Sequence, residues 1–122
     1  MTRARRLRAV RRGRWAETAA ALLLRLKGYR IIARDLRTPV GEIDLVARRG
    51  RVLVLVEVKA RGDEAVALGA LRAAQRHRII RAGAWLIARR PELCGLDLRC
   101  DVVIVTGFRL PRHLADAWQS PI

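Results

Sequence analysis

The sequence predicts an α/β domain with the element order αβββαβ, in which helices pack on a mixed central sheet. Apolar residues recur first at helical spacing, then at strand spacing, then at helical spacing again. Turn residues separate these segments, and the sequence contains no internal repeat. A chain of 122 residues of which 52% are hydrophobic can bury one core, so we expect a single domain over residues 13–122.

The first expected helix covers residues 14–27. Its apolar residues recur at steps of three and four positions, and Gly28 stands where a helix C-terminal cap belongs. Residues 1–12 contain six arginines and no acidic residue, as transit peptides do. No apolar segment of the kind that a targeting peptide needs follows them, so we expect a flexible basic arm.

Three strands are expected next, over residues 29–36, 42–48 and 52–58. A Thr-Pro-Val-Gly turn at residues 38–41 separates the first two, and an Arg-Gly turn at residues 49–50 joins the last two into a hairpin. The third strand is a continuous aliphatic run, which is typical of a strand covered on both faces.

The second half of the chain adds three elements. A long basic helix is expected from Leu68 to the break at Arg90, because apolar residues keep helical spacing there and proline follows. Residues 99–106 predict a fourth strand, and residues 113–118 predict a last short helix.

The formal net charge of +15 predicts a polyanionic partner. Nucleic acid, and DNA in particular, is the first candidate because each neutralised phosphate releases condensed counterions. The residues expected to contact it are Arg61, Arg72, Arg76 and Arg78. A genome that favours arginine codons would also raise the charge, so composition alone leaves the partner open, and a homodimer is also possible.

Cysteine usage and hydropathy indicate a cytoplasmic protein that does not cross a membrane. Cys94 and Cys100 lie six residues apart, without a second pair for a zinc site and without the spacing of a redox motif. We therefore expect reduced thiols. The longest apolar runs are strand-sized, well below the ~20 residues that a membrane span needs.

The hairpin carries the candidate metal site, formed by Asp44, Glu57 and Lys59. With an even-numbered loop centred on the Arg-Gly turn, Asp44 lies opposite Leu55 and diagonal to Glu57, within roughly 7 Å. Alternation puts Lys59 on the same face. Two carboxylates this close in a buried strand resist ionising unless a cation compensates them, which favours Mg²⁺ or Mn²⁺ with oxygen ligands.

Lysine at position 59 calls for an explanation of its own, because the chain has 24 arginines and two lysines. An ammonium is a compact charge that can sit beside a metal and an attacking water, whereas a guanidinium is planar and diffuse. Asp44, Glu57 and Lys59 thus fit phosphodiester hydrolysis. The alternative is that Glu57 and Lys59 form only an edge-strand ion pair.

The Gly-Glu-Ile-Asp-Leu-Val segment at residues 41–46 and the Val-Glu-Val-Lys-Ala-Arg segment at residues 56–61 resemble the YraN-type family of small bacterial proteins. The resemblance covers nearly all the chain after the basic arm. It implies a restriction-endonuclease-like fold with a PD-(D/E)xK site, as in archaeal Holliday-junction resolvases. Three positions depart from the family pattern without touching the triad: Asp35, Gln75 and Cys100.

The resemblance suggests further site residues. Glu17 on the first helix corresponds to a glutamate that serves as an extra metal ligand in related nucleases, although a solvated helix-face charge is the alternative. Gln75 is a candidate for orienting water or a phosphate, or is an ordinary surface glutamine. Glu42 is expected to be a rim charge or a partner for Arg61, and Asp101 a structural ion-pair or capping residue.

The aromatic residues and histidines carry weaker signals. Trp15, Trp85 and Trp118 have the spacing of core residues, although exposed tryptophans would be able to stack on bases. His77 and His113 lack a second ligand at metal spacing, so we expect both at the surface.

Three functions are consistent with these observations. The first is a divalent-metal-dependent endonuclease that hydrolyses DNA phosphodiesters, with structured or branched DNA as the substrate by analogy with resolvases. The second is a non-catalytic nucleic-acid-binding module of the same fold. The third is an interaction protein whose basic faces bind an acidic partner. An intact Asp44, Glu57 and Lys59 set favours the first.

Overall fold

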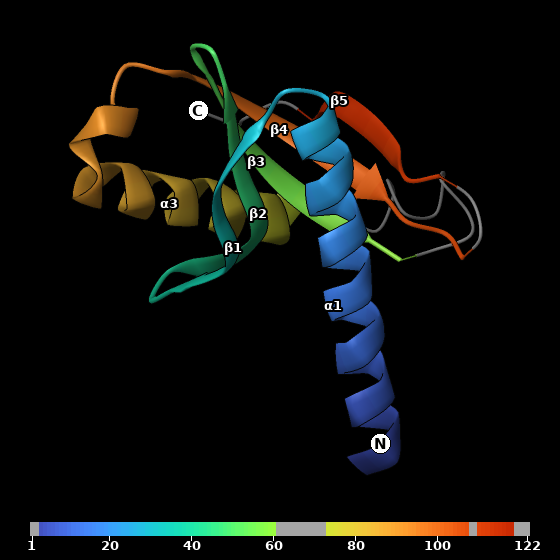
Figure 1. The fold of residues 1–122 in the computed structure, drawn as a ribbon. Helices are drawn as coiled ribbons and strands as arrows, with labels where there is room; N and C mark the ends of the chain where they lie inside the picture. Colours follow the sequence, from blue (N-terminus) through green and yellow to red (C-terminus); the bar gives the residue numbers. More distant parts are fainter. Residues whose placement is uncertain (1–2, 61–72, 108–109, 119–122) are drawn as a thin grey trace.

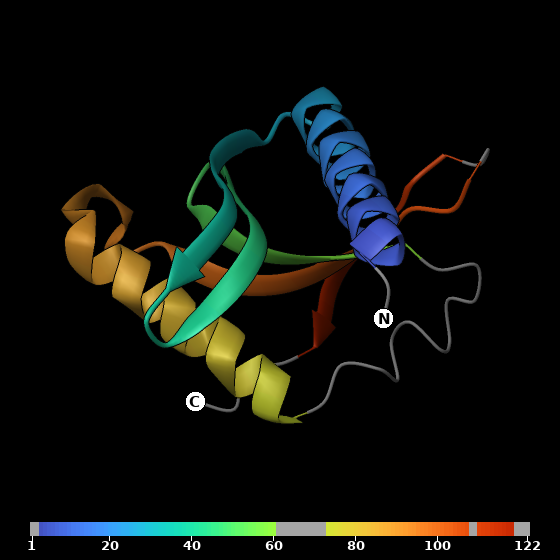
Figure 2. The same ribbon diagram turned by 90° about the horizontal axis from the view of Figure 1, so that it is seen from below.

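The computed structural model describes residues 3–60, 73–107 and 110–118, which form a five-stranded sheet between two helices (Figures 1 and 2). The strand order is β1-β2-β3-β4-β5, with β3 and β4 parallel and the other neighbouring pairs antiparallel. This confirms the predicted α/β class with a mixed sheet. In chain order the elements are α1 (Arg3–Leu26), β1 (Arg30–Thr38), β2 (Gly41–Arg49), β3 (Val52–Lys59), α3 (Ala73–Arg89), the 3₁₀ turn η1 (Pro91–Leu93), β4 (Asp97–Ile104) and β5 (Arg112–Trp118).

Helix α1 covers one face of the sheet. Its small and aliphatic side chains recur at four-residue steps, at Ala16, Ala20 and Leu24, and they bury against Val54 and Val56 of β3. This spacing places them on one side of the helix. The close approach that alanine allows brings the first turns of this packed segment near the end of β3.

Helix α3 covers the opposite face. Ile79, Ala82 and Leu86 pack against Leu53 and Leu55, the β3 side chains that alternate with those facing α1. Burial on both faces explains why β3 is a continuous aliphatic run, as the sequence predicted. The helix was expected from Leu68, and the part before Ala73 lies outside the described residues.

Helix α1 begins earlier than predicted and ends where predicted. It starts at Arg3 rather than near residue 14, so the backbone of residues 3–12 continues the helix, and Figure 1 shows this end extending away from the sheet. At the other end Gly28 has a φ of +91°, and the N–H of Tyr29 donates to the carbonyl of Leu24 at 2.9 Å. Among the described residues, no helix is both long and apolar enough to cross a membrane.

The β1–β2 turn lies directly against α3. The hydroxyl of Thr38 closes the turn, accepting a hydrogen bond from the Gly41 N–H at 3.0 Å. A Cβ at position 41 would collide with the carbonyl oxygen of Arg78 in α3. Glycine at this position therefore lets α3 pack over the hairpin, which brings the N-terminal part of α3 to the end of β3.

The C-terminal segment is a strand, so the predicted helix over residues 113–118 is wrong. β5 pairs with the edge of β4, and the register shifts where Asp116 adopts a φ of +51°. Pairing supplies partners for the backbone groups of β4 that a helix would leave without them. Leu114 and Ala117 also pack against the core on the α3 side, and this burial overrides local helix propensity.

Asp101 of β4 is fully buried and fixes β5 in place. Its carboxylate accepts hydrogen bonds from Arg99 Nε at 2.9 Å, from the Asp116 N–H at 2.9 Å and from His113 Nε2 at 2.5 Å. Burial acts to raise the pKa of Asp101, but the hydrogen bonds from His113 and Arg99 hold it below its ordinary value. The structural role predicted for Asp101 is confirmed. His113, expected at the surface, has a side chain only 3% exposed.

Both cysteines are free thiols, as predicted. Cys94 is exposed and Cys100 is buried. Burial raises the pKa of the Cys100 thiol to about 12, so it stays protonated and packs as a small apolar residue.

Candidate active site

The β2–β3 hairpin brings Asp44 and Glu57 together. The last paired residues of the ladder at this end are Leu45 and Val56, and the two acidic residues occupy the next position along each strand. The backbone N–H of Val58 donates to Asp44 Oδ2 at 2.8 Å. The Asp44 carboxylate thus takes the place of a backbone acceptor where the ladder ends, and this fixes it beside β3.

The predicted register of the hairpin was two residues off. Val46, not Asp44, pairs with Leu55, because the two residues outside the ladder are Gly50 and Arg51. Gly50 takes a φ of +60°, which a tight hairpin turn requires. A shift of two preserves which side chains share a face, and it moves Asp44 from a diagonal to a directly opposite position relative to Glu57.

Glu57 is the centre of a hydrogen-bonded cluster. Lys59 Nζ lies 3.3 Å from Glu57 Oε1, and Gln75 Nε2 of α3 donates to the same oxygen at 3.1 Å. The side chains of Glu57 and Lys59 are 11% and 14% exposed, so both charges are largely withdrawn from water. The structure therefore brings together Asp44, Glu57, Lys59 and Gln75, four residues singled out from the sequence.

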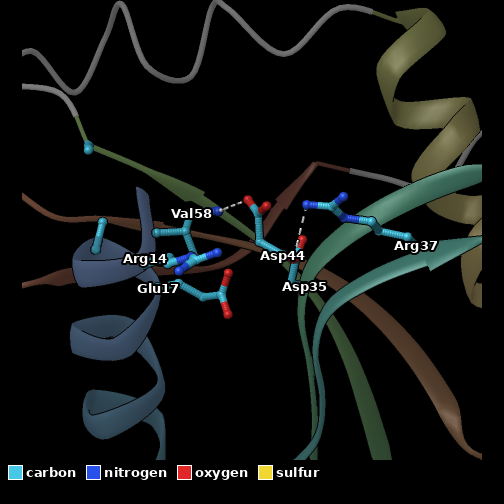
Figure 3. Close-up of a pocket in the computed structure, with 8 residues that line it drawn as sticks. Arg14, Glu17, Asp35, Arg37, Asp44 and Val58 are labelled. Carbon is cyan, nitrogen blue, oxygen red and sulfur yellow. Dashed lines mark hydrogen bonds and ion pairs between the residues drawn. The ribbon is translucent and has the colours of Figure 1, made fainter. Parts of the chain in front are cut away.

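A pocket of about 260 Å³ opens beside Asp44 on the side of α1 (Figure 3). Its lining comes from α1, β1, β2, β3 and the residue that follows β3, and consists of Arg14, Ala16, Glu17, Asp35, Arg37, Asp44, Val58 and Ala60. Glu57, Lys59 and Gln75 do not line it. Asp44 therefore connects the pocket with the Glu57 cluster at the point where β2 and β3 part.

Glu17 lies in this pocket but is held by another partner. Arg34 Nε lies 3.2 Å from Glu17 Oε1, and the Glu17 side chain is 15% exposed. Within the described ranges, no three histidine, cysteine, aspartate or glutamate side chains gather closely enough to hold a metal ion. The structure thus pairs Asp44 with Glu57 and leaves the role of Glu17 as a third ligand a prediction.

Asp35 lines the pocket but was not among the site residues predicted from the sequence. The β1–β2 pairs on either side, Arg34 with Leu45 and Leu36 with Ile43, place Asp35 opposite Asp44. Its backbone has a φ of +46°. Aspartate and asparagine adopt this conformation more readily than other side chains. An aspartate near the end of the expected first strand was therefore an available signal for a left-handed residue near the site.

Burial raises the pKa of both paired carboxyls. The pKa of Glu57 rises to about 7, through burial first and the charge of Asp44 second, although Lys59 acts in the opposite direction. Burial also raises the pKa of Asp44, although the hydrogen bond from the Val58 N–H lowers it. At neutral pH the pair therefore resists carrying two negative charges unless a further cation lies close by.

Glu57→Gln is expected to stabilise the metal-free protein at about pH 8. Because the folded-state pKa of Glu57 is about 7 and its ordinary value is 4.5, the folded state holds this proton more tightly, so stability falls as the pH rises through that interval. The loss amounts to roughly 3 kcal/mol, which the uncharged glutamine avoids. Urea unfolding in EDTA at about pH 4 and about pH 8 measures the difference. An equal effect at both pH values would contradict the raised pKa.

The residues expected to contact nucleic acid are only partly described. Arg76 and Arg78 lie on α3, with Arg78 exposed. Arg61 and Arg72 lie outside the described residues. His77, on the same helix, is exposed as predicted.

Two tryptophans differ in their surroundings. Trp15 was expected in the core but is 55% exposed on α1, so that prediction is wrong. Its side chain points away from the side formed by Ala16 and Ala20, which packs on the sheet. Trp85 is half-buried and packs against the core, with the Arg89 guanidinium 3.8 Å from its ring centroid. Glu42 is exposed at the start of β2, as expected of a rim charge.

The fold and the site define an α/β protein whose mixed sheet carries an acidic pair and a lysine at adjoining strand ends. The chain belongs to the family described as uncharacterised protein family UPF0102, whose model matches residues 16–105. That range includes Glu17, Asp44, Glu57, Lys59 and Gln75, and the match confirms the family predicted from the sequence.

Relatives within this family align over most of their length. A UPF0102 protein of Parvibaculum lavamentivorans is 59% identical over 113 residues, which cover 93% of this chain and 85% of the relative. A UPF0102 protein of Paramagnetospirillum magneticum is 51% identical over 115 residues, covering 91% and 89%. A UPF0102 protein of Rhizobium etli is 50% identical over 113 residues, covering 93% of each chain.

Proposed function

We propose that the chain is a divalent-metal-dependent endonuclease of the restriction-endonuclease-like class that hydrolyses phosphodiester bonds in DNA. One observation carries this proposal: Asp44 and Glu57 lie opposite each other with raised pKa values, beside Lys59. If the two carboxylates had only a structural role, a protein with a single carboxylate here would be more stable at neutral pH, because the second negative charge is destabilising. A hard cation removes that cost.

The donor set fits Mg²⁺ or Mn²⁺. Asp44 and Glu57 offer oxygen ligands, and Mg²⁺ is commonly held by one or two carboxylates together with water and substrate phosphates. Two protein carboxylates therefore suffice, and Glu17, which lines the same pocket as Asp44 and pairs with Arg34, is proposed as a third ligand. When bound, such an ion supplies a Lewis acid and lowers the pKa of water.

The protein's own groups hold the site in shape. The Val58 N–H fixes the Asp44 carboxylate, and Gln75 fixes Glu57 from α3. Lys59 places an ammonium next to Glu57 Oε1, where it stabilises negative charge that develops on the phosphate and orients the attacking water. Because both strands belong to one tight hairpin, these positions are set by the ladder rather than by a loop.

Charge supports nucleic acid as the substrate. The net charge of +15 gives a surface that attracts a polyanion, and Arg14 and Arg37 line the pocket beside Asp44. Structured or branched DNA is the substrate proposed first, with Arg76 and Arg78 as contacts on α3 and Arg61 and Arg72 as contacts in the segment between β3 and α3.

A cleavage panel tests the proposal. Linear, nicked, flapped and four-way DNA are incubated with the protein and Mg²⁺ or Mn²⁺, and Mn²⁺ binding is titrated in parallel. We expect cleavage of at least one structure and metal binding that weakens sharply in Asp44→Asn, because a carboxylate ligand is lost. Asp97→Asn, which removes the same charge from an exposed position of β4, is the matched control and should leave both unchanged.

The outcomes separate the candidate functions. Metal binding that is the same in Asp44→Asn and in the unmodified chain would contradict the site. DNA binding without cleavage of any structure would favour the non-catalytic binding module. If the protein neither binds nor cuts DNA, the result would favour an interaction protein whose basic faces bind an acidic protein partner.

A further inference from the structure

We infer that Arg14 and Arg37 form a phosphate clamp that holds the phosphodiester next to the one being cut. This inference rests on the proposed function and assigns a binding subsite to the pocket beside Asp44. Arg14 belongs to α1 and Arg37 to β1, so the two guanidinium groups come from elements that lie on different sides of the pocket. Figure 3 shows Arg14 and Arg37 approaching it from opposite sides, with Asp44 between them.

Both arginines have guanidinium groups that a ligand can engage. Arg14 is exposed, and within the described part of the chain it has no hydrogen bond or ion pair, since Glu17, one turn along the helix, pairs with Arg34 instead. Arg37 Nη2 lies 3.3 Å from Asp35 Oδ2, with the two side chains 73% and 57% exposed. Ion pairs this exposed contribute little, so a phosphate can replace Asp35 as the partner at small cost.

The lining of the pocket suits one nucleotide unit of a strand. Ala16, Val58 and Ala60 supply small apolar surfaces between the charged side chains, and a deoxyribose can pack against such surfaces. A planar guanidinium matches the geometry of a phosphate with two parallel hydrogen bonds. A volume of about 260 Å³ is small for a whole organic ligand and ample for a phosphate with part of its sugar.

Position relative to Asp44 decides which phosphate is held. Asp44 lines the pocket, whereas Glu57 and Lys59 do not, so of these three described residues Asp44 is the one that connects the pocket with the proposed cutting centre. A strand that places one phosphate between Asp44 and Lys59 therefore continues into the pocket with its neighbouring nucleotide. The clamp would fix the direction of the strand across β2 and β3 without reading its sequence.

The salt dependence of DNA binding tests the clamp without requiring cleavage. Binding of a labelled four-way junction and a labelled linear duplex is measured by fluorescence anisotropy in EDTA at several salt concentrations. The Arg14→Gln/Arg37→Gln double variant is compared with Arg25→Gln/Arg51→Gln, which removes the same charge from exposed positions of α1 and of the β2–β3 turn outside the pocket. Thermal unfolding checks that both variants fold.

We expect the clamp variant to reduce the slope of log K against log salt by about 0.9 for each lost phosphate contact. At roughly 0.1 M salt this corresponds to about eightfold weaker binding for each contact. The control variant should keep the slope of the unmodified chain. Equal slopes in the two variants would overturn the clamp, and so would a failure of the unmodified chain to bind either DNA. Loss of slope in a protein that does not cut DNA would keep the subsite and reject only the catalytic proposal.

Discussion

Lys59→Arg is expected to abolish cleavage while leaving the affinity for DNA nearly unchanged. The Lys59 side chain is 14% exposed and its ammonium lies 3.3 Å from Glu57 Oε1, in a space shared with Gln75. A guanidinium is longer, spreads its charge over a plane and cannot place one compact donor at the same point. Removing a donor aimed at a developing charge typically costs roughly 10²- to 10³-fold in rate, and we expect a loss of at least this size.

The chain provides its own control for this substitution. Lys27, the other lysine, is exposed at the end of α1 and contacts His113 rather than the acidic pair. Lys27→Arg should therefore retain full cleavage. Single-turnover rates and DNA affinities of the two variants give the comparison, with the unmodified protein as reference. Full-rate cleavage by Lys59→Arg would remove Lys59 from the mechanism and leave it an electrostatic partner of Glu57.

Asp101→Ala should lower the free energy of unfolding by roughly 3 to 5 kcal/mol, the usual consequence of removing one partner from a buried ion pair. Asp101 is fully buried, and the guanidinium of Arg99 and the imidazole of His113 both bond to its carboxylate. Without it, those groups and the Asp116 N–H lose their acceptor, and β5 loses the contact that holds it to β4. Urea denaturation at neutral pH measures the loss.

The pH dependence of that loss identifies its cause. Since the folded state lowers the pKa of Asp101 below 3.8, its stabilising contribution is complete above that ordinary value and disappears as the pH falls through the lowered one. The difference between Asp101→Ala and the unmodified protein should therefore shrink in strong acid. Asp97→Ala, an exposed aspartate of the same strand, should change stability little. An Asp101→Ala protein as stable as the Asp97→Ala protein would show that the buried network contributes nothing.

Local patterns were enough to predict most of the elements that carry the site. The cap at Gly28 ends α1, the aliphatic run of β3 is covered on both faces, and the hairpin joins β2 to β3. These features depend on side chains within a few residues of one another and on the period of two that strands impose. The same period explains why Asp44 and Glu57 were brought together correctly even though the register was off by two residues.

Contacts between distant segments decided the rest. Residues 113–118 became a strand because β4 offered an unpaired edge and Asp101 a buried acceptor for His113, and neither is visible in the local sequence of that segment. Trp15 was left exposed because the alanines of α1, not its largest side chain, fit against the sheet.

The sequence by itself determined the α/β class, the hairpin and the choice of Asp44, Glu57 and Lys59 as candidate site residues, because these follow from short-range periodicity and residue chemistry. Only the tertiary structure decided that Gln75 bonds to Glu57, that Glu17 pairs with Arg34, and that Asp35, Arg14 and Arg37 surround Asp44. Those relations depend on how α1 and α3 dock on the two faces of the sheet. Docking is set by the summed packing of many small contacts, such as the approach of α3 over Gly41, and no local pattern encodes that sum.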